Sequence, residues 1–193
     1  MKTNKYLVLI SVSLISMVLG SCGTSLTLPA TSSNMERVYL IQYDTWGHHS
    51  LAFFRNGKLI EFTYGDWELF ALNKRDLWTG WKNMTFPTEG ALGKKIVGFN
   101  EGDSICSKFI GCNKTASFQA PSHKVSELLI MLEESYLEES KSEVYNSLEE
   151  VFFVKHKRRY WLWHNCNHQL VEWLEYLGAK VSGRILFSPN FIE

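Results

Sequence analysis

The sequence lacks an excess of charge of either sign. Its 20 Lys and Arg residues balance 20 Asp and Glu residues, so the formal net charge at neutral pH is zero. A nucleic-acid-binding domain presents a concentrated basic surface. The basic run from Lys155 to Trp161 is balanced by the acidic segments that precede it. We therefore expect no nucleic-acid partner.

Long apolar runs are also scarce, and the clearest one stands near the start of the chain. Lys2 and Lys5 precede an apolar stretch from Tyr6 to Leu19, which is shorter than the roughly 20 residues of a membrane-spanning helix. A basic start, an apolar centre and small residues at the end are typical of a secretory signal peptide. We expect residues 1–21 to be this signal peptide.

The Leu-Gly-Ser-Cys sequence that ends at Cys22 resembles the bacterial lipobox, which implies that Cys22 is diacylated and becomes the mature N-terminus. Several acyl chains would hold the protein firmly at a membrane. This predicts a lipid-anchored protein of the bacterial cell envelope, on the periplasmic side of the outer membrane. Residues 22–36 are expected to be a flexible tether, and residues 37–193 have the size of one domain.

Cysteine is rare, with four residues in the chain. If Cys22 carries lipid, three remain. Cys106 and Cys112 stand six residues apart in a loop-like stretch and can form a disulfide in an oxidising compartment. Cys166 is then left over, and a leftover cysteine in an exported protein is a candidate reactive thiol.

Strand patterns come first in the chain and helical patterns come late, which predicts an α+β domain. The strongest signal is a β-hairpin over residues 48–66, with Asn56-Gly57 at its turn. Apolar residues at helical spacing predict one helix over residues 125–140. A second helix is expected over residues 167–177, ending at Gly178.

Cys166 shares a helical face with Leu170 and Leu174 and follows Asn165, a good N-cap residue type. In the first turn of a helix, the dipole and the unpaired backbone N–H groups favour a thiolate. The same N–H groups can bind the oxyanion of a tetrahedral intermediate. A buried, unreactive cysteine on a helix face is the alternative. A nucleophilic cysteine also needs an imidazole base and a polar residue that orients it.

Two histidines at the head of the hairpin are candidates for that base, and the turn decides which of them shares a face with Glu61. A two-residue Asn56-Gly57 loop sets position 61 on the face of His48. A three-residue loop with Gly57 as a bulge sets it on the face of His49. Both loops suit the sequence.

Three segments carry a family resemblance. "HSLAFFRNGKLIE" (49–61) resembles the histidine–strand–turn–strand unit of circularly permuted papain-like proteins, the NlpC-type superfamily that includes lecithin retinol acyltransferase and YiiX-type proteins. "EFTYGDWELF" (61–70) and "NCNHQLVEWLEYLGAKV" (165–181) are similar to two blocks of an uncharacterised bacterial branch of this superfamily. In that form a histidine leads the hairpin, a polar residue follows on its second strand, and the cysteine begins a helix near the C-terminus.

The resemblance implies a permuted papain-like α+β fold, an antiparallel sheet with the nucleophile on the C-terminal helix. It implies Cys166 as nucleophile, His49 as base by spacing, and Glu61 as the residue that orients the imidazole. His48 and Asp66 are the alternates for base and orienting residue. With His49 as base, we predict the three-residue bulged loop. The expected activity is cysteine-dependent hydrolysis or transfer at an amide bond of peptidoglycan peptide, with no metal or organic cofactor.

Other functions fit parts of the sequence. A lipid ester or N-acyl hydrolase would use the same Cys–His site. The His-x-Cys-x-His cluster around Cys166, with His48 and His49, offers zinc-ligating residue types, although His168 lies about 200° round a helix that begins at Cys166. A non-catalytic envelope lipoprotein that binds a partner through the tryptophans of residues 67–81 is a third possibility.

Overall fold

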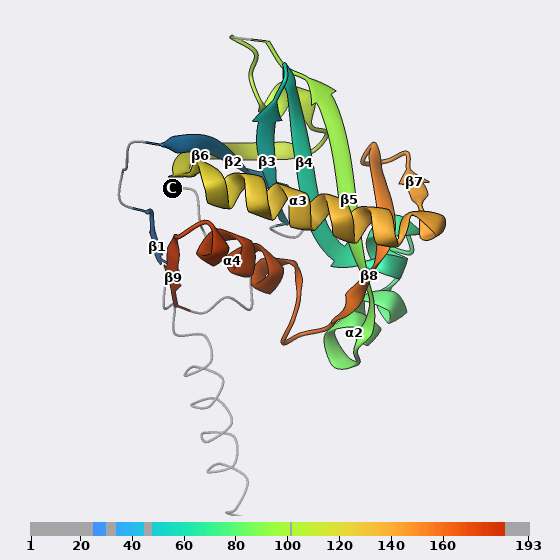
Figure 1. The fold of residues 1–193 in the computed structure, drawn as a ribbon. Helices are drawn as coiled ribbons and strands as arrows, with labels where there is room; N and C mark the ends of the chain where they lie inside the picture. Colours follow the sequence, from blue (N-terminus) through green and yellow to red (C-terminus); the bar gives the residue numbers. More distant parts are fainter. Residues whose placement is uncertain (1–24, 30–33, 45–47, 101, 184–193) are drawn as a thin grey trace, which may run out of the picture.

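Figure 1 shows the fold in a computed structural model of the chain, of which residues 25–29, 34–44, 48–100 and 102–183 are described. The proposed signal peptide and Cys22 lie outside these residues. In chain order the elements are β1 (Ser25–Thr27), β2 (Met35–Tyr43), β3 (His49–Arg55), β4 (Lys58–Asp66), η1 (Trp67–Ala71), α2 (Leu77–Thr85), β5 (Thr88–Gly98), η2 (Cys106–Lys108), β6 (Cys112–Pro121), α3 (Ser122–Glu138), η3 (Ser140–Ser142), β7 (Val144–Asn146), β8 (Val151–Tyr160), α4 (Cys166–Tyr176) and β9 (Lys180–Ser182).

The strands form one large sheet of seven members in the order β6-β2-β3-β4-β5-β8-β7, and every neighbouring pair is antiparallel. A separate antiparallel pair joins β1 to β9. With its helices, this sheet makes the structure α+β, as the order of patterns in the sequence predicts. The central strands β3 and β4 come from the hairpin that begins with the two histidines.

One face of the sheet carries both long helices, α3 and α4, as Figure 1 shows. Leu128 of α3 and Leu170 and Leu174 of α4 belong to the same buried cluster as Leu51 of β3 and Phe62 of β4. Burial of apolar surface stabilises a fold by about 25 cal/mol per Å², so this cluster is the main reason that α4 is held across β3 and β4. The predicted helices match α3 and α4, and α4 begins at Cys166 itself.

The opposite face of the sheet is covered by two smaller clusters. Phe109, after η2, packs with Ile41 and Leu59. Phe70 of η1 packs with Phe153 of β8 in the second cluster. Because successive side chains of a strand point to opposite faces, each residue of β3 and β4 belongs either to the helix-covered face or to this second face.

The turn between β3 and β4 fixes that assignment, and here the prediction of a three-residue bulged loop is wrong. Arg55 pairs with Lys58, so the loop has two residues. Asn56 and Gly57 both have positive φ, 50° and 75°, which is the type I′ geometry that Asn-Gly prefers. Its twist matches that of the flanking strands, whereas the bulged loop would shift every later residue of β4 to the other face.

The expected tether over residues 22–36 is also structured where it is described. Ser25–Thr27 form β1, which pairs with β9 after the last helix, and β2 begins at Met35. Turn and linker composition did not reveal this pairing because its partner lies more than 150 residues away in sequence. Within the described ranges, no helix is both long enough and apolar enough to cross a bilayer.

Candidate functional site

Cys166 is the first residue of α4, and the chain around it is locally fixed. The Asn165 side chain accepts hydrogen bonds from the backbone N–H groups of Asn167 and His168, at 3.0 and 3.3 Å. His168 Nδ1 in turn lies 3.4 Å from the backbone N–H of Asn165, which completes a capping box. This cap explains why the helix starts where it does. Cys166 is a free cysteine and is partly buried.

The Cys166 thiol faces the sheet and has Tyr160 of β8 as its hydrogen-bond partner. Burial raises the pKa of Cys166 to about 11, against the opposing effects of the Tyr160 hydroxyl and of the backbone N–H groups of Asn167 and Cys166. The helix terminus therefore favours the thiolate, as the sequence predicts, but desolvation outweighs it. At neutral pH the free protein holds a protonated thiol.

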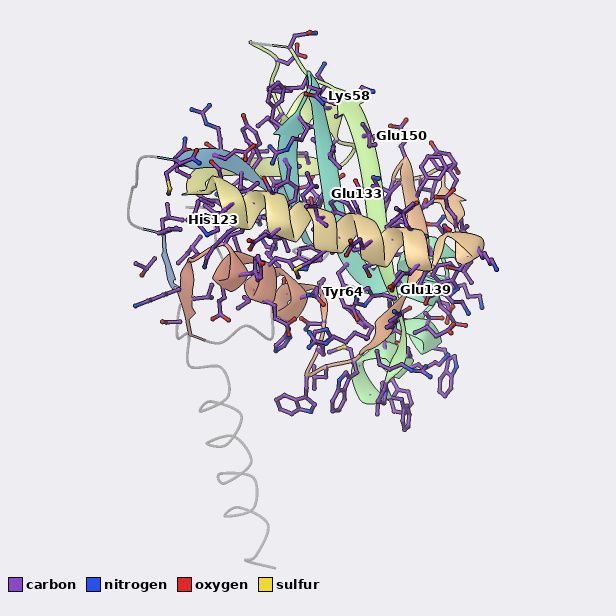
Figure 2. The ribbon with its side chains drawn as sticks, in the orientation of Figure 1. Lys58, Tyr64, His123, Glu133, Glu139 and Glu150 are labelled. Carbon is purple, nitrogen blue, oxygen red and sulfur yellow. A yellow bond between two sulfur atoms is a disulfide. The ribbon has the colours of Figure 1, made fainter. Side chains whose placement is uncertain are left out.

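His49 lies on the same face of the sheet as Cys166. It is buried at the start of β3, on the face of Leu51. Ser50 pairs with Thr63, and continuing this register by one residue sets His49 beside Tyr64 of β4. Burial raises the pKa of Tyr64, with Asp66 and Cys166 among the charges that add to the effect. Tyr64, labelled in Figure 2 beside the N-terminal end of α4, thus adjoins both members of the predicted pair.

Glu61 is not placed to orient His49. It pairs with Ala52 and points to the second face, on the other side of the sheet. There it is buried, and its Oε1 accepts hydrogen bonds from Ser50, at 2.5 Å, and from the Tyr43 hydroxyl. The expected role of Glu61 depended on the bulged loop, and the two-residue turn removes it.

His48 lies on the same second face as Glu61, away from Cys166. Its Nε2 is 2.5 Å from Thr63 Oγ1. Burial, and after it the neighbouring charge of His49, lowers the pKa of His48 to about 3, so the imidazole is neutral at physiological pH. His48, the alternate base, therefore does not reach the thiol.

Asp66, the alternate orienting residue, stands on the helix-covered side at the end of β4. Its Oδ1 caps η1 by accepting from the Leu69 backbone N–H at 2.8 Å, and its Oδ2 accepts from Thr88 Oγ1 at 2.5 Å. Burial raises the pKa of this carboxyl, and the two hydrogen bonds oppose that shift. Thr88 Oγ1 also lies 3.0 Å from the Tyr160 carbonyl. Asp66 thus supports the strand that carries Tyr160.

The remaining candidates have other roles. Cys106 and Cys112 are joined by a disulfide, with Cα atoms 5.1 Å apart. His168, in the zinc hypothesis, is used in the capping box, and His48 lies across the sheet. Over the described ranges, no three His, Cys, Asp or Glu side chains gather as a metal site would require.

Sequence reasoning missed the aromatic side chains that surround the thiol. Tyr64 contacts Tyr160, with ring centroids 5.9 Å apart, and His164, at 5.5 Å. His164 is a second imidazole on this face, and burial lowers its pKa. The available signal was "RRYWLW", the segment directly before the cysteine turn, but only the pairing of Thr88 with Tyr160 sets its tyrosine against α4.

Alkylation of Cys166 tests this description of the thiol. With a pKa of about 11, the iodoacetamide rate should keep rising with pH well beyond the unperturbed value of about 8.5. Modified Cys166 is quantified by mass spectrometry from about pH 6 to about pH 12, a range that spans both the ordinary and the raised pKa of the thiol. A plateau near pH 7 would instead mean a preformed thiolate–imidazolium pair.

Comparison of the chain with family models, with curated proteins and with solved structures finds no match. The arguments for a function therefore come from the site itself.

Proposed function

We propose that the protein is a cysteine-dependent acyl-transfer enzyme with a permuted papain-like arrangement, in which Cys166 is the nucleophile and His49 is the base. The observation that carries the proposal is a free thiol at the first residue of a capped helix, packed on the face of the sheet that bears His49. A cysteine at a helix N-terminus with an imidazole base to take its proton is the combination that such enzymes use.

The first step is attack of Cys166 Sγ on the substrate carbonyl. Because the thiol is protonated at rest, its proton passes to the His49 imidazole as the S–C bond forms. The resulting oxyanion accepts hydrogen bonds from the backbone N–H of Cys166 and from the Tyr160 hydroxyl. When the tetrahedral intermediate collapses, His49 returns the proton to the leaving amine or alcohol, and an acyl-enzyme remains.

Water, activated by His49, then attacks the thioester carbonyl and releases the acid. No step requires Glu61 or His48, which lie on the second face. In the resting protein Tyr64, beside His49, is the side chain placed to limit movement of the imidazole ring. We propose the amide bonds of peptidoglycan peptide as the substrate class, on the basis of the predicted envelope location.

Lipid esters or N-acyl lipids are the second candidate substrates, and a specific observation favours them. The exposed face of α2 is rich in tryptophan and other large apolar side chains, and its buried Asn83 lies beside Asp66 at the end of β4. A surface of this kind on the chain suits a substrate that is presented in a membrane.

The experiment is to incubate the protein with peptidoglycan peptides and, separately, with phospholipid and N-acyl lipid vesicles, and to analyse intact protein by mass spectrometry after acid quenching. The expected result is an acyl adduct on Cys166 whose mass identifies the substrate class. Product release from both substrate classes in a Cys166→Ala variant would contradict the proposal.

A further inference from the structure

The second face of the sheet holds a pocket that the proposed reaction does not use. Its volume is about 230 Å³, below the range of about 300–1,000 Å³ that is usual for drug-sized ligands. The polar floor comes from Tyr43 at the end of β2, from His48 directly before β3, and from Glu61 and Thr63 of β4, and the walls are largely apolar. The apolar residues are Phe70, Ile110, Leu148 and Val151.

The floor contains hydrogen-bonding atoms that the fold leaves without partners. Glu61 is 1% exposed, and both Ser50 and the Tyr43 hydroxyl donate to its Oε1. Its Oε2 has no hydrogen-bond partner among the described residues, and the same holds for Nδ1 of His48. Leaving a buried polar atom without a hydrogen-bond partner destabilises the fold, and more so when the group is charged. Such a cost at the floor of a pocket indicates a ligand.

The charges around the pocket indicate what that ligand carries. Arg75 and Glu149 at the rim pair with each other at 2.6 Å. Lys95 stands opposite Glu61 on the neighbouring strand, but its ammonium group is bonded to Glu150 at 3.1 Å. Glu61 is therefore the acidic residue of the pocket without a bonded cation. Burial raises the pKa of its carboxyl group, and an N–H donor at Oε2 would favour the ionised carboxylate.

We propose that this pocket binds a small organic amine, whose ammonium group donates to Glu61 Oε2 and whose short apolar chain lies between Phe70 and Leu148. The size of the pocket and its four apolar wall residues set the length of that chain. The site is separate from Cys166, since the sheet lies between them, and the proposal does not rest on the proposed reaction.

The test is a ligand-observed NMR titration of the full chain with n-butylamine, with n-butanol as an uncharged control of similar shape. The amine should bind saturably and at least about tenfold more tightly than the alcohol, the factor expected for one charge-assisted hydrogen bond. Glu61→Gln should remove that preference, while Cys166→Ala should leave it intact. Non-saturable binding, or equal binding of amine and alcohol, would overturn the proposal.

Two measurements keep the test decisive if Glu61→Gln folds poorly. In the wild-type protein, the carboxyl ¹³C resonance of Glu61 should move on addition of amine and not on addition of alcohol. Glu149→Gln, a change at the partly exposed rim, should keep the preference for amine over alcohol. A loss of binding in Glu149→Gln with an unmoved Glu61 resonance would assign the amine to the rim and contradict the proposal.

A second inference comes from α2, whose amphipathic pattern is reversed. The buried side chains of this helix are Thr79 and Asn83, whereas Leu77 is 95% exposed, Trp78 67% and Trp81 53%. Trp78 and Trp81 stack at 5.4 Å. Figure 2 shows ring side chains projecting outward around α2, away from the sheet. Met84 and Phe86 extend this surface and are also exposed.

The exposed side chains of Leu77, Trp78, Trp81, Met84 and Phe86 form an apolar tip of the molecule. This tip suits a lipid bilayer better than a protein partner. A nine-residue helix is about 14 Å long, and a stable protein interface uses about 20–30 residues a side. Tryptophan is the residue type enriched at membrane–water interfaces, and leucine and phenylalanine enter the acyl region. Lys74 and Lys82, near the base of the tip, both pair with Glu68, so the surface is apolar with little net charge.

We infer that α2 inserts its exposed face into the interface of a lipid bilayer. The test uses the full chain and phosphatidylcholine vesicles that contain brominated lipid. Fluorescence of the wild-type protein should be quenched, and the quenched fraction should fall in a Trp78→Ser/Trp81→Ser variant. Ile96→Ser, a change of an exposed apolar residue on β5, is the matched control and should leave quenching unchanged.

Because quenching reports on the tryptophans themselves, the result does not depend on how the N-terminal segment binds the vesicles. Equal quenched fractions in the wild type and the double variant would overturn the inference. So would a dimer in sedimentation analysis that the double variant abolishes, since the tip would then bind a second copy of the chain.

Discussion

Replacing Cys166 or His49 by alanine should lower the rate of acyl transfer by about 10⁴-fold or more, the loss typical when a nucleophile or its base is removed. The Cys166 change removes the atom that attacks the carbonyl. The His49 change removes the acceptor for the thiol proton, which matters because Cys166 is protonated at neutral pH. The measurement is kcat/KM on whichever substrate yields the acyl adduct, with circular dichroism to confirm folding.

His48→Ala is the matched control, since it changes the adjacent residue on the opposite face of the sheet. It should leave kcat within a small factor, because His48 contacts Thr63 and not the thiol. It should lower the free energy of unfolding by about 1–3 kcal/mol, since it leaves the buried Thr63 hydroxyl without its partner. An active His49→Ala with an inactive His48→Ala would show that the register argument fails.

His164→Ala separates two candidate bases on the same face. The His164 ring contacts the Tyr64 ring, and His164 Nδ1 lies 3.9 Å from Glu172 Oε1. If its removal abolishes activity while His49→Ala retains it, the base has been assigned to the wrong histidine. If both variants are inactive and folded, His164 contributes alongside His49.

The sequence was sufficient for the parts of the fold that depend on local patterns. The hairpin with Asn56-Gly57 at its turn and the helix that follows Asn165 both form as expected, because turn chemistry and N-capping act within a few residues. The choice between a two-residue and a three-residue loop was a different matter. It depends on a small difference in backbone twist, and yet it decides the face of every residue in β4.

The position of Cys166 at the start of a helix did not predict the environment of its thiol. The dipole and N–H groups are local and predictable, but the burial that raises the pKa of Cys166 comes from packing of α4 on the domain, and its hydrogen-bond partner Tyr160 comes from the distant strand β8. The same limit applies to β1, whose partner β9 is distant in sequence. Long-range pairing determined what local composition left open.

Tyr160→Phe should lower kcat by about 10²- to 10³-fold, the effect of removing one oxyanion donor, with little change in KM. The Tyr160 hydroxyl is hydrogen-bonded to the Cys166 sulfur. It is therefore close to the carbonyl group that the sulfur attacks, and it can donate to the carbonyl oxygen. Burial, and then the Cys166 charge, raises the pKa of Tyr160 far above its usual value. The hydroxyl therefore remains a donor throughout the working pH range.

Two further observations separate this role from packing. Because the Tyr160 hydroxyl lowers the pKa of Cys166, the alkylation profile of Tyr160→Phe should move to still higher pH, which a purely structural residue would not cause. Tyr64→Phe is the matched control, since the Tyr64 hydroxyl donates to the Arg158 carbonyl at 3.1 Å. Its loss should cost about 1 kcal/mol of stability and leave the alkylation profile in place. If Tyr160→Phe keeps both the wild-type kcat and the wild-type profile, Tyr160 is a core residue, and the oxyanion is held by backbone N–H groups alone.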